Sequence, residues 1–213
     1  QFTANTMAMV LSTLGLSPLG YNDIPATHPA KGAAAFRCGE LVMECLRENR
    51  TPRELITRTS MRNAARMVAA TAGSTNAVLH LLAIAREAGV AWTLEDFEPA
   101  SVHTPVIADL LPGGRYTAVE LFGAGGSARV AQELIAAGML EDTPTVTGRS
   151  LYAEAAAAPR AEAQDVVHPV SAPLKPRGGY SILYGNLAPE GCILKLAGKG
   201  ASHFEGRARV YEG

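Results

Sequence analysis

The polar stretch Ser74-Thr75-Asn76 is the first group of residues whose types and spacing could bind a ligand. It follows Gly73 and opens an apolar helical pattern that runs to Ala88. Side chains of these types cap the free backbone N–H groups at the start of a helix, and capping accounts for one of the three. The positive end of the helix dipole beside them also favours a carboxylate. The sequence alone therefore leaves a capped turn and a carboxylate-binding turn both open.

A second candidate is the glycine-rich stretch Gly123–Ala128, which fits the dinucleotide fingerprint G-x-G-x-x-A. The strand-like run Thr117–Phe122 precedes it, and Glu141 and Asp142 lie where an acid that binds ribose is expected. This pattern predicts a nucleotide-binding oxidoreductase. However, an acidic residue interrupts the run, and no second strand–helix–strand unit follows. A tight turn with Ser127 as a helix cap is the competing interpretation.

The three cysteines form neither a metal-binding nor a disulfide pattern. Cys38 and Cys45 fall on one predicted helix, about 10.5 Å apart along its axis, whereas a disulfide requires Cα atoms within about 7 Å. Cys192 is distant in sequence. The spacings C-x₂-C, H-x₃-H and H-E-x-x-H do not occur in the sequence. We therefore expect buried free thiols, as in proteins of the reducing cytoplasm.

The composition favours a core of small side chains. Of 213 residues, 37 are Ala and 21 are Gly; the hydrophobic fraction is 47% and the aromatic fraction only 6%. This is enough apolar material for a folded core, and it favours closely packed helices and tight turns. The net charge is −1, with no run of like charges. Nucleic-acid-binding proteins normally carry a clustered basic surface, so we expect no nucleic-acid partner.

No segment predicts a membrane span or a secretory leader. The uncharged stretch Met67–Ala85 is broken by polar residues, and it fits two helices around a turn better than one span. The opening stretch Gln1–Met7 carries no basic residues ahead of an apolar run. The chain also begins without Met, close to a helical pattern, and we expect it to be a fragment of a larger protein.

Helical periodicity dominates the first two-thirds of the chain. Capping boxes are predicted at Thr51–Glu54 and Thr93–Asp96, and helix ends at Gly15 and Gly89. The run Pro105–Leu111 could be a strand or a helical turn. The predicted helices cover residues 7–14, 31–48, 61–70, 75–88, 128–137 and 151–158.

Beyond Gln164 the pattern changes to short apolar runs between turn residues. These runs predict strands at Tyr180–Tyr184, Cys192–Leu196 and Ala208–Tyr211. The turn-forming residues Pro189–Gly191 are expected to precede the second strand.

The change of pattern divides the chain into three parts. We predict an α-rich domain over residues 1–160, a linker over 161–177 and the start of a β domain over 178–213. A β domain of fewer than about forty residues cannot close its sheet and bury a core. The β part is therefore expected to be incomplete.

Several segments together resemble the dihydroxy-acid, 6-phosphogluconate and sugar-acid dehydratase family. They occur in the family's order and extend over essentially the whole chain. The stretches S-T-N-A-V-L-H-L-L and G-N-L-A-P-E-G-C are the most specific, and they look closest to the dihydroxy-acid branch. The resembling segments are residues 1–9, 14–18, 24–28, 73–85, 105–110 and 185–192.

The resemblance implies a fold and an activity. The implied fold is α/β, with a helix-rich N-terminal dehydratase domain, partial in this chain, followed by the first strands of a C-terminal β-barrel-like domain. The implied activity is that of a hydro-lyase of branched-chain amino-acid biosynthesis, which dehydrates a 2,3-dihydroxy carboxylic acid to a 2-keto acid. A sugar-acid (aldonate) dehydratase of the same family remains an alternative.

The resemblance also implies cofactors and partners. Family members use an iron–sulfur cluster, 2Fe-2S or 4Fe-4S, and Mg²⁺ as Lewis acids on a small dihydroxy acid. The cluster cysteines and all but one Mg²⁺ ligand precede the segment matching Gln1, whereas the last ligand and the catalytic serine follow the segment matching Gly213. We therefore assign no metal ligand and no catalytic residue to this chain and expect the isolated chain to be inactive. We expect the full-length enzyme to be cytoplasmic and a homodimer or higher homo-oligomer.

The resemblance changes which of the two candidate sites we favour. It favours Ser74, Thr75 and Asn76 as substrate-binding residues and makes the dinucleotide interpretation of Gly123–Ala128 secondary. Two positions depart from the family pattern. Ala72 stands where the family usually has Gly, and Arg207 where it usually has Pro.

Overall fold

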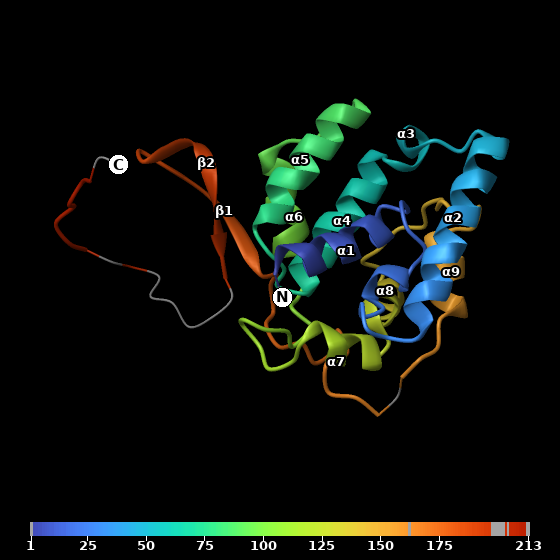
Figure 1. The fold of residues 1–213 in the computed structure, drawn as a ribbon. Coiled ribbons are helices and arrows are strands. Elements are labelled where there is room, and N and C mark those ends of the chain that lie inside the picture. Colours follow the sequence, from blue (N-terminus) through green and yellow to red (C-terminus); the bar gives the residue numbers. More distant parts are fainter. Residues whose placement is uncertain (1, 162, 197–202, 204, 212–213) are drawn as a thin grey trace.

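Helix α4 (Arg58–Ala70) lies at the centre of the fold, and helices α1, α5, α6 and α8 pack against it (Figure 1). The computed structural model describes residues 2–161, 163–196, 203 and 205–211. Ala64, Ala65, Ala69 and Ala70 of α4 have no exposed surface. Because these side chains are small, neighbouring segments approach α4 closely, as the composition predicted.

Helices account for most of the regular structure. Thr51, Thr57 and Thr117 form capping boxes at helix starts, and Gly15 and Gly89 follow helix ends with φ angles of +79° and +74°. None of the helices in the described residues is long and apolar enough to cross a bilayer. Besides α4 they are α1 (Thr3–Thr13), α2 (Ala30–Glu48), α3 (Pro52–Leu55), α5 (Asn76–Ala88), α6 (Phe97–Val102), α7 (Ala118–Gly123), α8 (Gly126–Ala136) and α9 (Leu151–Ala157), with 3₁₀ turns at Tyr21–Asp23 and Leu94–Asp96.

Two hydrophobic clusters lie on opposite sides of α4. The first contains residues of α1, α5 and α6, and its aromatic centre is Phe97, whose ring centroid lies 5.6 Å from that of Trp92 and 6.4 Å from that of Tyr180. The second contains Met67 and Ala70 of α4 together with residues of α7, α8 and α9. Because α4 is buried on both sides, it determines the positions of the helices in both clusters.

The C-terminal end of α4 joins segments that are distant in sequence. The last carbonyl groups of a helix have no partner within the helix. Ala70 O accepts hydrogen bonds from Ile107 N (2.8 Å) and Ala108 N (3.2 Å), and Ala69 O accepts one from Gly179 N (3.1 Å). These bonds hold an extended segment and the approach to the hairpin against the helix end.

Two glycines allow the chain to pass this helix end. A Cβ atom added to Gly178 would lie 2.7 Å from the Ala69 Cβ, and one added to Gly179 would lie 2.4 Å from the Ala72 Cα. Gly178 N also donates a hydrogen bond to Ser101 O (2.9 Å). Any larger residue at either position would push the chain away from α4 and α6.

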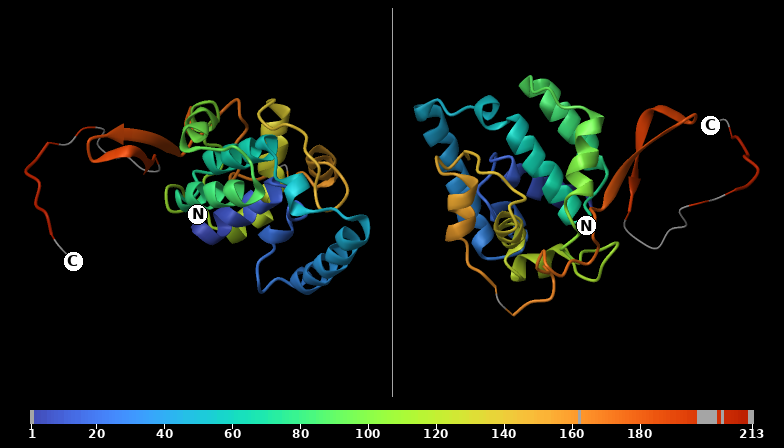
Figure 2. Two further views of the ribbon diagram at one scale, coloured as in Figure 1. Left: turned by 90° about the horizontal axis from the view of Figure 1, so that it is seen from above. Right: turned by 180° about the vertical axis from the view of Figure 1, so that it is seen from behind.

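The chain then forms an antiparallel hairpin that projects from the helical body (Figures 1 and 2). Its strands are β1 (Tyr180–Gly185) and β2 (Ala188–Lys195), and the pairing of Tyr180 with Lys195 sets their register. A helix-rich domain followed by the start of a sheet is the predicted fold class, and the structure confirms it.

Side chains of the helical body anchor the first residues of β1. Tyr180 is buried, and its hydroxyl donates a hydrogen bond to Ala65 O (3.2 Å). Burial raises the pKa of this hydroxyl, so it remains a donor. The Glu98 carboxylate accepts hydrogen bonds from Ile182 N (2.6 Å) and Ser181 Oγ (3.1 Å).

The six predicted helices and the first two predicted strands are present in the structure. Three local expectations are wrong. Thr117–Phe122 is not a strand, because Thr117 caps α7 and its N–H donates to Glu120 Oε2 (2.7 Å). Pro189–Gly191 lies within β2 and not before it, and Ala208–Tyr211 is not a strand.

The segment Pro105–Leu111 is extended and pairs with the predicted linker through isolated bridges. Val106 pairs with Lys175 and Ala108 with Val167. Val167 is 2% exposed and belongs to the second cluster. This part of the predicted linker is therefore packed against the helical domain.

Asn63 fixes the loop after α8 to the centre of the fold. Its side chain has no exposed surface; Nδ2 donates to Glu141 O (2.8 Å) and Oδ1 accepts from Glu141 N (3.0 Å). The amide thus satisfies a backbone donor and acceptor, as a neighbouring strand would. The Glu141 carboxylate also pairs with Arg62 at the surface (2.6 Å).

Replacing Asn63 with Leu should lower the free energy of unfolding by about 2–4 kcal/mol, because a buried N–H and C=O lose their partners. The matched control is Arg62→Ala, which removes only the exposed ion pair to the same residue and should cost less than about 1 kcal/mol. Urea unfolding followed by circular dichroism measures both values. Equal losses in the two variants would contradict this assignment.

Candidate functional site

The turn between α4 and α5 is fastened to the first turn of α1. The Thr6 hydroxyl is buried; it donates to Phe2 O (3.0 Å) and accepts a hydrogen bond from Ser74 N (2.9 Å). A Cβ atom added to Gly73 would lie 2.8 Å from Thr6 Cγ2. Glycine at position 73 is what allows the turn to approach α1.

Ser74 and Asn76 meet at the hydroxyl of Thr3. Thr3 Oγ1 lies 3.1 Å from Ser74 Oγ and accepts a hydrogen bond from Asn76 Nδ2 (2.8 Å). Ser74 Oγ lies 3.3 Å from Asn76 N and accepts its hydrogen bond, so Ser74, one residue before the N-cap Thr75, satisfies the first N–H of α5. We refer to Thr3, Ser74, Thr75 and Asn76 as the polar cluster.

Thr75 differs from its two neighbours. It is half-buried and precedes α5 with helical backbone angles, φ −62° and ψ −21°. Its hydroxyl makes no hydrogen bond within the part of the chain that the structure describes. Thr75 therefore has a free donor and acceptor at the start of a helix.

The positive ends of two helices meet at the polar cluster. Helix α1 begins at Thr3 and α5 at Asn76, and no side chain caps the start of α1. The first N–H groups of a helix lack partners within it, and the helix dipole makes this end attractive to anions. Two such ends beside hydroxyl and amide donors can bind a carboxylate.

The sequence analysis missed Thr3 and Thr6, which hold the predicted residues in place. Both belong to the opening T-A-N-T sequence, and their spacing of three residues places both hydroxyls on one face of a helix. This spacing is the feature that could have indicated them. Their partners are about 70 residues away in the chain, and periodicity does not reveal such contacts.

A cavity of about 320 Å³ lies beside the first turn of α1. Phe2 and Asn5 line it from α1, and Leu111, Tyr116 and Ala118 line it from the segment leading into α7. Most of its lining is apolar. It provides space for a small non-polar group next to the start of α1.

The glycine-rich turn at the start of α8 holds a carboxylate of the chain itself. Gly125 adopts φ +103°, and Asp23 Oδ2 accepts hydrogen bonds from Ser127 N and Ser127 Oγ, both at 2.6 Å. A Cβ atom on Gly126 would lie 2.5 Å from Asp23 Oδ2. Burial is the main influence on Asp23 and raises its pKa.

These findings overturn the dinucleotide interpretation of Gly123–Ala128. The preceding segment is helix α7, so the turn joins two helices, whereas the fingerprint requires a strand before the helix. Asp23 occupies the place where a pyrophosphate would bind. The predicted ribose-binding acids have other partners, because Glu141 pairs with Arg62 and Asp142 Oδ1 accepts from Tyr152 N (2.9 Å).

No three metal-binding side chains gather anywhere in the described residues. Cys38 and Cys45 lie on α2 as predicted and are half-buried free thiols. Cys192 is also free, but it is exposed, so the expectation of burial is wrong for this residue. The donor set of the described residues fits neither an iron–sulfur cluster nor Mg²⁺.

Comparison with family profiles places this helical domain and hairpin in a family of dehydratases. The profile described as dihydroxy-acid/6-phosphogluconate dehydratase N-terminal matches residues 1–154, and the corresponding C-terminal profile matches residues 165–213. The chain belongs to the dihydroxy-acid/6-phosphogluconate dehydratase family, and the resemblance seen in the sequence is confirmed.

Relatives in this family carry the name dihydroxy-acid dehydratase. A protein of Thermus thermophilus is 54% identical over 214 residues, which cover 100% of this chain and 39% of that protein. Those of Roseiflexus sp. and Koribacter versatilis are 49% and 50% identical, again over 100% of this chain, and 38% and 37% of their own lengths are covered. The chain thus spans about two fifths of the length of these relatives.

Ala72 ends α4 in a conformation that favours glycine. Its φ is +44°; Ala72 N donates to Ala69 O (3.2 Å) and Gly73 N to Val68 O (2.9 Å), which is the hydrogen-bond pattern of a Schellman motif. A Cβ atom makes the left-handed conformation unfavourable by about 1–2 kcal/mol. The departure from the family pattern noted at this position therefore has a physical cost.

Replacing Ala72 with Gly should raise the free energy of unfolding by about 0.5–1 kcal/mol, because the strain outweighs the greater freedom of glycine in the unfolded chain. Gly89→Ala is the matched control. Gly89 closes α5 at φ +74°, and an added Cβ there would meet nothing within 4 Å, so this change should lower stability by a similar amount. Denaturant unfolding measures the free energy of unfolding of both variants. An Ala72→Gly variant that is less stable than the parent would show that Ala72 is not strained.

Proposed function

We propose that the polypeptide containing this chain is a hydro-lyase that dehydrates 2,3-dihydroxy carboxylic acids to 2-keto acids. The observation that carries the proposal is the 54% identity to a dihydroxy-acid dehydratase over the whole chain. The geometry of the polar cluster supports it independently, because two helix N-termini and a free hydroxyl suit a small carboxylic acid. A reaction of this kind belongs to branched-chain amino-acid biosynthesis.

The role of this chain in the proposed reaction is to bind and orient the substrate. Ser74 and Asn76 hold each other and Thr3 in place, so the cluster is ordered before a ligand arrives. Thr75 has a free hydroxyl and is the residue we assign to the substrate carboxylate. We assign the alkyl end of a branched dihydroxy acid to the apolar cavity of about 320 Å³ beside the first turn of α1.

The cofactors of the proposed enzyme are an iron–sulfur cluster and Mg²⁺. When bound, they would act as Lewis acids on the hydroxyl groups of the substrate. Since the donor set of the described residues fits neither group, the proposal places their ligands in other parts of the full-length polypeptide and assigns no step to them here.

The remaining expectations on organisation form part of the same proposal. Residues 1–160 would form the partial N-terminal domain, 161–177 the connection and 178–213 the start of the C-terminal domain. The C-terminal profile begins at residue 165, within the connection. We further propose a cytoplasmic enzyme that works as a homo-oligomer.

A sugar-acid dehydratase is the second candidate, because the matching profiles also include 6-phosphogluconate dehydratases. The apolar lining of the cavity beside α1 favours an alkyl group over the hydroxyl groups of a sugar acid. This observation ranks the dihydroxy-acid substrate first.

The full-length gene product, supplied with iron, sulfide and Mg²⁺, should convert 2,3-dihydroxyisovalerate to its 2-keto acid. Keto-acid formation can be followed with a hydrazine reagent or a coupled dehydrogenase. Aldonates and 6-phosphogluconate serve as comparison substrates. Faster turnover of a sugar acid would favour the second candidate, and turnover of none of these substrates would refute the proposed function.

Replacing Thr75 with Val in the full-length enzyme should raise KM about tenfold, because a hydrogen bond to a charged group contributes about 1.5 kcal/mol or more. The melting temperature should stay near that of the parent, since the hydroxyl has no partner in the described chain. Thr75→Ser should restore KM. Ser74→Ala is the structural control and should lower the melting temperature. An unchanged KM in Thr75→Val would remove Thr75 from the substrate site.

A further inference from the structure

A second cavity, of about 440 Å³, lies between the start of α8 and the segment that follows α9. Leu19, Ile24, Phe122 and Pro159 are among the apolar residues of its wall. It shares no residue with the polar cluster or with the lining of the cavity beside α1. Its volume is within the range of small-molecule sites, so it is a separate candidate site.

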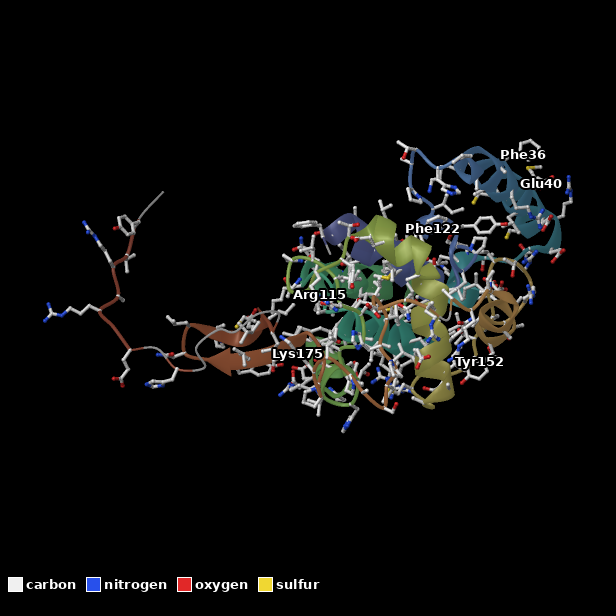
Figure 3. The ribbon with its side chains drawn as sticks, turned by 90° about the horizontal axis from the view of Figure 1, so that it is seen from below. Phe36, Glu40, Arg115, Phe122, Tyr152 and Lys175 are labelled. Atoms are coloured by element: carbon white, nitrogen blue, oxygen red, sulfur yellow. The ribbon has the colours of Figure 1, made fainter. Side chains whose placement is uncertain are left out.

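An aromatic ring and several glycines give this cavity its shape. Figure 3 shows Phe122 at the end of α7, beside the segment that leads to α2, and its ring centroid lies 5.0 Å from that of His28 in an edge-to-face arrangement. The glycines bring no side chains into the cavity, and they leave room for an apolar group against the ring. They are Gly20, Gly123, Gly125 and Gly126.

Asp23 lines the cavity with a carboxylate that has no cationic partner. Its Oδ2 accepts both hydrogen bonds from Ser127, whereas its Oδ1 has no partner among the described residues. Asp23 forms no ion pair with any described residue, and Lys31 Nζ donates to Ile24 O (2.9 Å) instead. Burial raises the pKa of Asp23 in spite of the Ser127 hydrogen bonds and the charge of Lys31. A cation in the cavity would therefore stabilise the ionised carboxylate.

Arg160 lines the same cavity with the opposite charge. Its Nη2 lies 3.2 Å from Glu133 Oε1, but the same oxygen lies 2.6 Å from Nη1 of Arg129. Arg129 and Glu133 are both buried, whereas the side chain of Arg160 is 62% exposed. Two guanidinium groups thus share one carboxylate, and no second acid among the described residues pairs with them. One positive charge is left without a partner at the edge of the cavity.

The two unpaired charges define the chemistry of a ligand. Asp23 and Arg160 line one cavity but form no ion pair with each other in the described chain. An ammonium group suits Asp23, because it carries three hydrogen-bond donors and no acceptor. A carboxylate suits the guanidinium group of Arg160. An α-amino acid carries both groups on one carbon atom, and a non-polar side chain would complement the apolar wall.

We propose that this cavity binds an α-amino acid with an apolar side chain, in its zwitterionic form. The ammonium group donates a hydrogen bond to Asp23 Oδ1, the carboxylate pairs with Arg160, and the side chain packs against the ring of Phe122. Each charge of the ligand then meets a charge that the described chain leaves unpaired. The assignment is independent of the proposed dehydratase activity, because it uses none of the residues assigned to the substrate.

The test is a titration of the full-length gene product with L-leucine, in which NMR follows the proton signals of the ligand. The dissociation constant should be about 1 mM or lower. Three analogues each lack one group: 4-methylpentanoate the ammonium group, 3-methylbutylamine the carboxylate and glycine the side chain. Each should bind at least about tenfold more weakly. A singly charged analogue that binds as tightly as L-leucine would contradict recognition of the zwitterion.

Two variants test the charged contacts separately. Asp23→Asn keeps an oxygen acceptor for Ser127 but removes the charge, and it should raise the dissociation constant for L-leucine at least about tenfold. Arg160→Gln should raise it about fivefold, since this side chain is largely exposed. Arg53→Gln is the matched control, because Arg53 is 70% exposed and lies outside the cavity, and it should leave the constant unchanged.

Three further results would overturn the proposal. The first is the absence of any change in the ligand signals at about 10 mM L-leucine. The second is binding that is equally tight in Asp23→Asn, Arg160→Gln and the parent, which would place the amino acid elsewhere. The third is displacement of L-leucine by 2,3-dihydroxyisovalerate, which would assign the amino acid to the substrate site. If Asp23→Asn does not fold, Arg160→Gln and the analogues decide the matter.

Discussion

The free carbonyl groups at the end of α4 are the constraint on which the rest of the structure depends. A buried helix cannot leave these groups to water, so other backbone segments must supply the N–H donors. Residues 107–108 and Gly179 do so at Ala70 and Ala69, and Ala72 and Gly73 close the helix through the turn that leads to α5. The extended segment, the hairpin and the polar cluster are all positioned by this one helix end.

The polar cluster becomes a candidate site only through tertiary contacts, because its residues have no distinctive pattern in the sequence. Ser74 and Asn76 alone are ordinary residues at the start of a helix. Their role depends on Thr3 and on the buried Thr6, whose hydroxyl determines where the turn lies. Two helix starts come together only because α1 and α5 both pack on α4. The electrostatic character of the site is thus a consequence of the tertiary packing.

Most of the helices could be predicted because their ends are encoded locally. Capping residues and glycines mark these ends, and the structure uses them as the spacing indicates. The failure at Thr117–Phe122 was avoidable, since Thr117 and Glu120 form the same capping box as Thr51 and Glu54. The contacts of Thr3 with the cluster, and of Asp23 with α8, could not be predicted, because they join residues 71 and 104 positions apart.

The paired glycines before β1 have a consequence for whatever follows the hairpin. Because neither Gly178 nor Gly179 has space for a side chain, the strand leaves the helical body by a single route, fixed at both Ser101 and Ala69. Every residue carried beyond that point inherits its starting orientation from these two positions. The close packing and the backbone hydrogen bonds at these two glycines set the direction in which the hairpin leaves the helical body. The same contacts therefore set where residues beyond the hairpin can lie relative to that body.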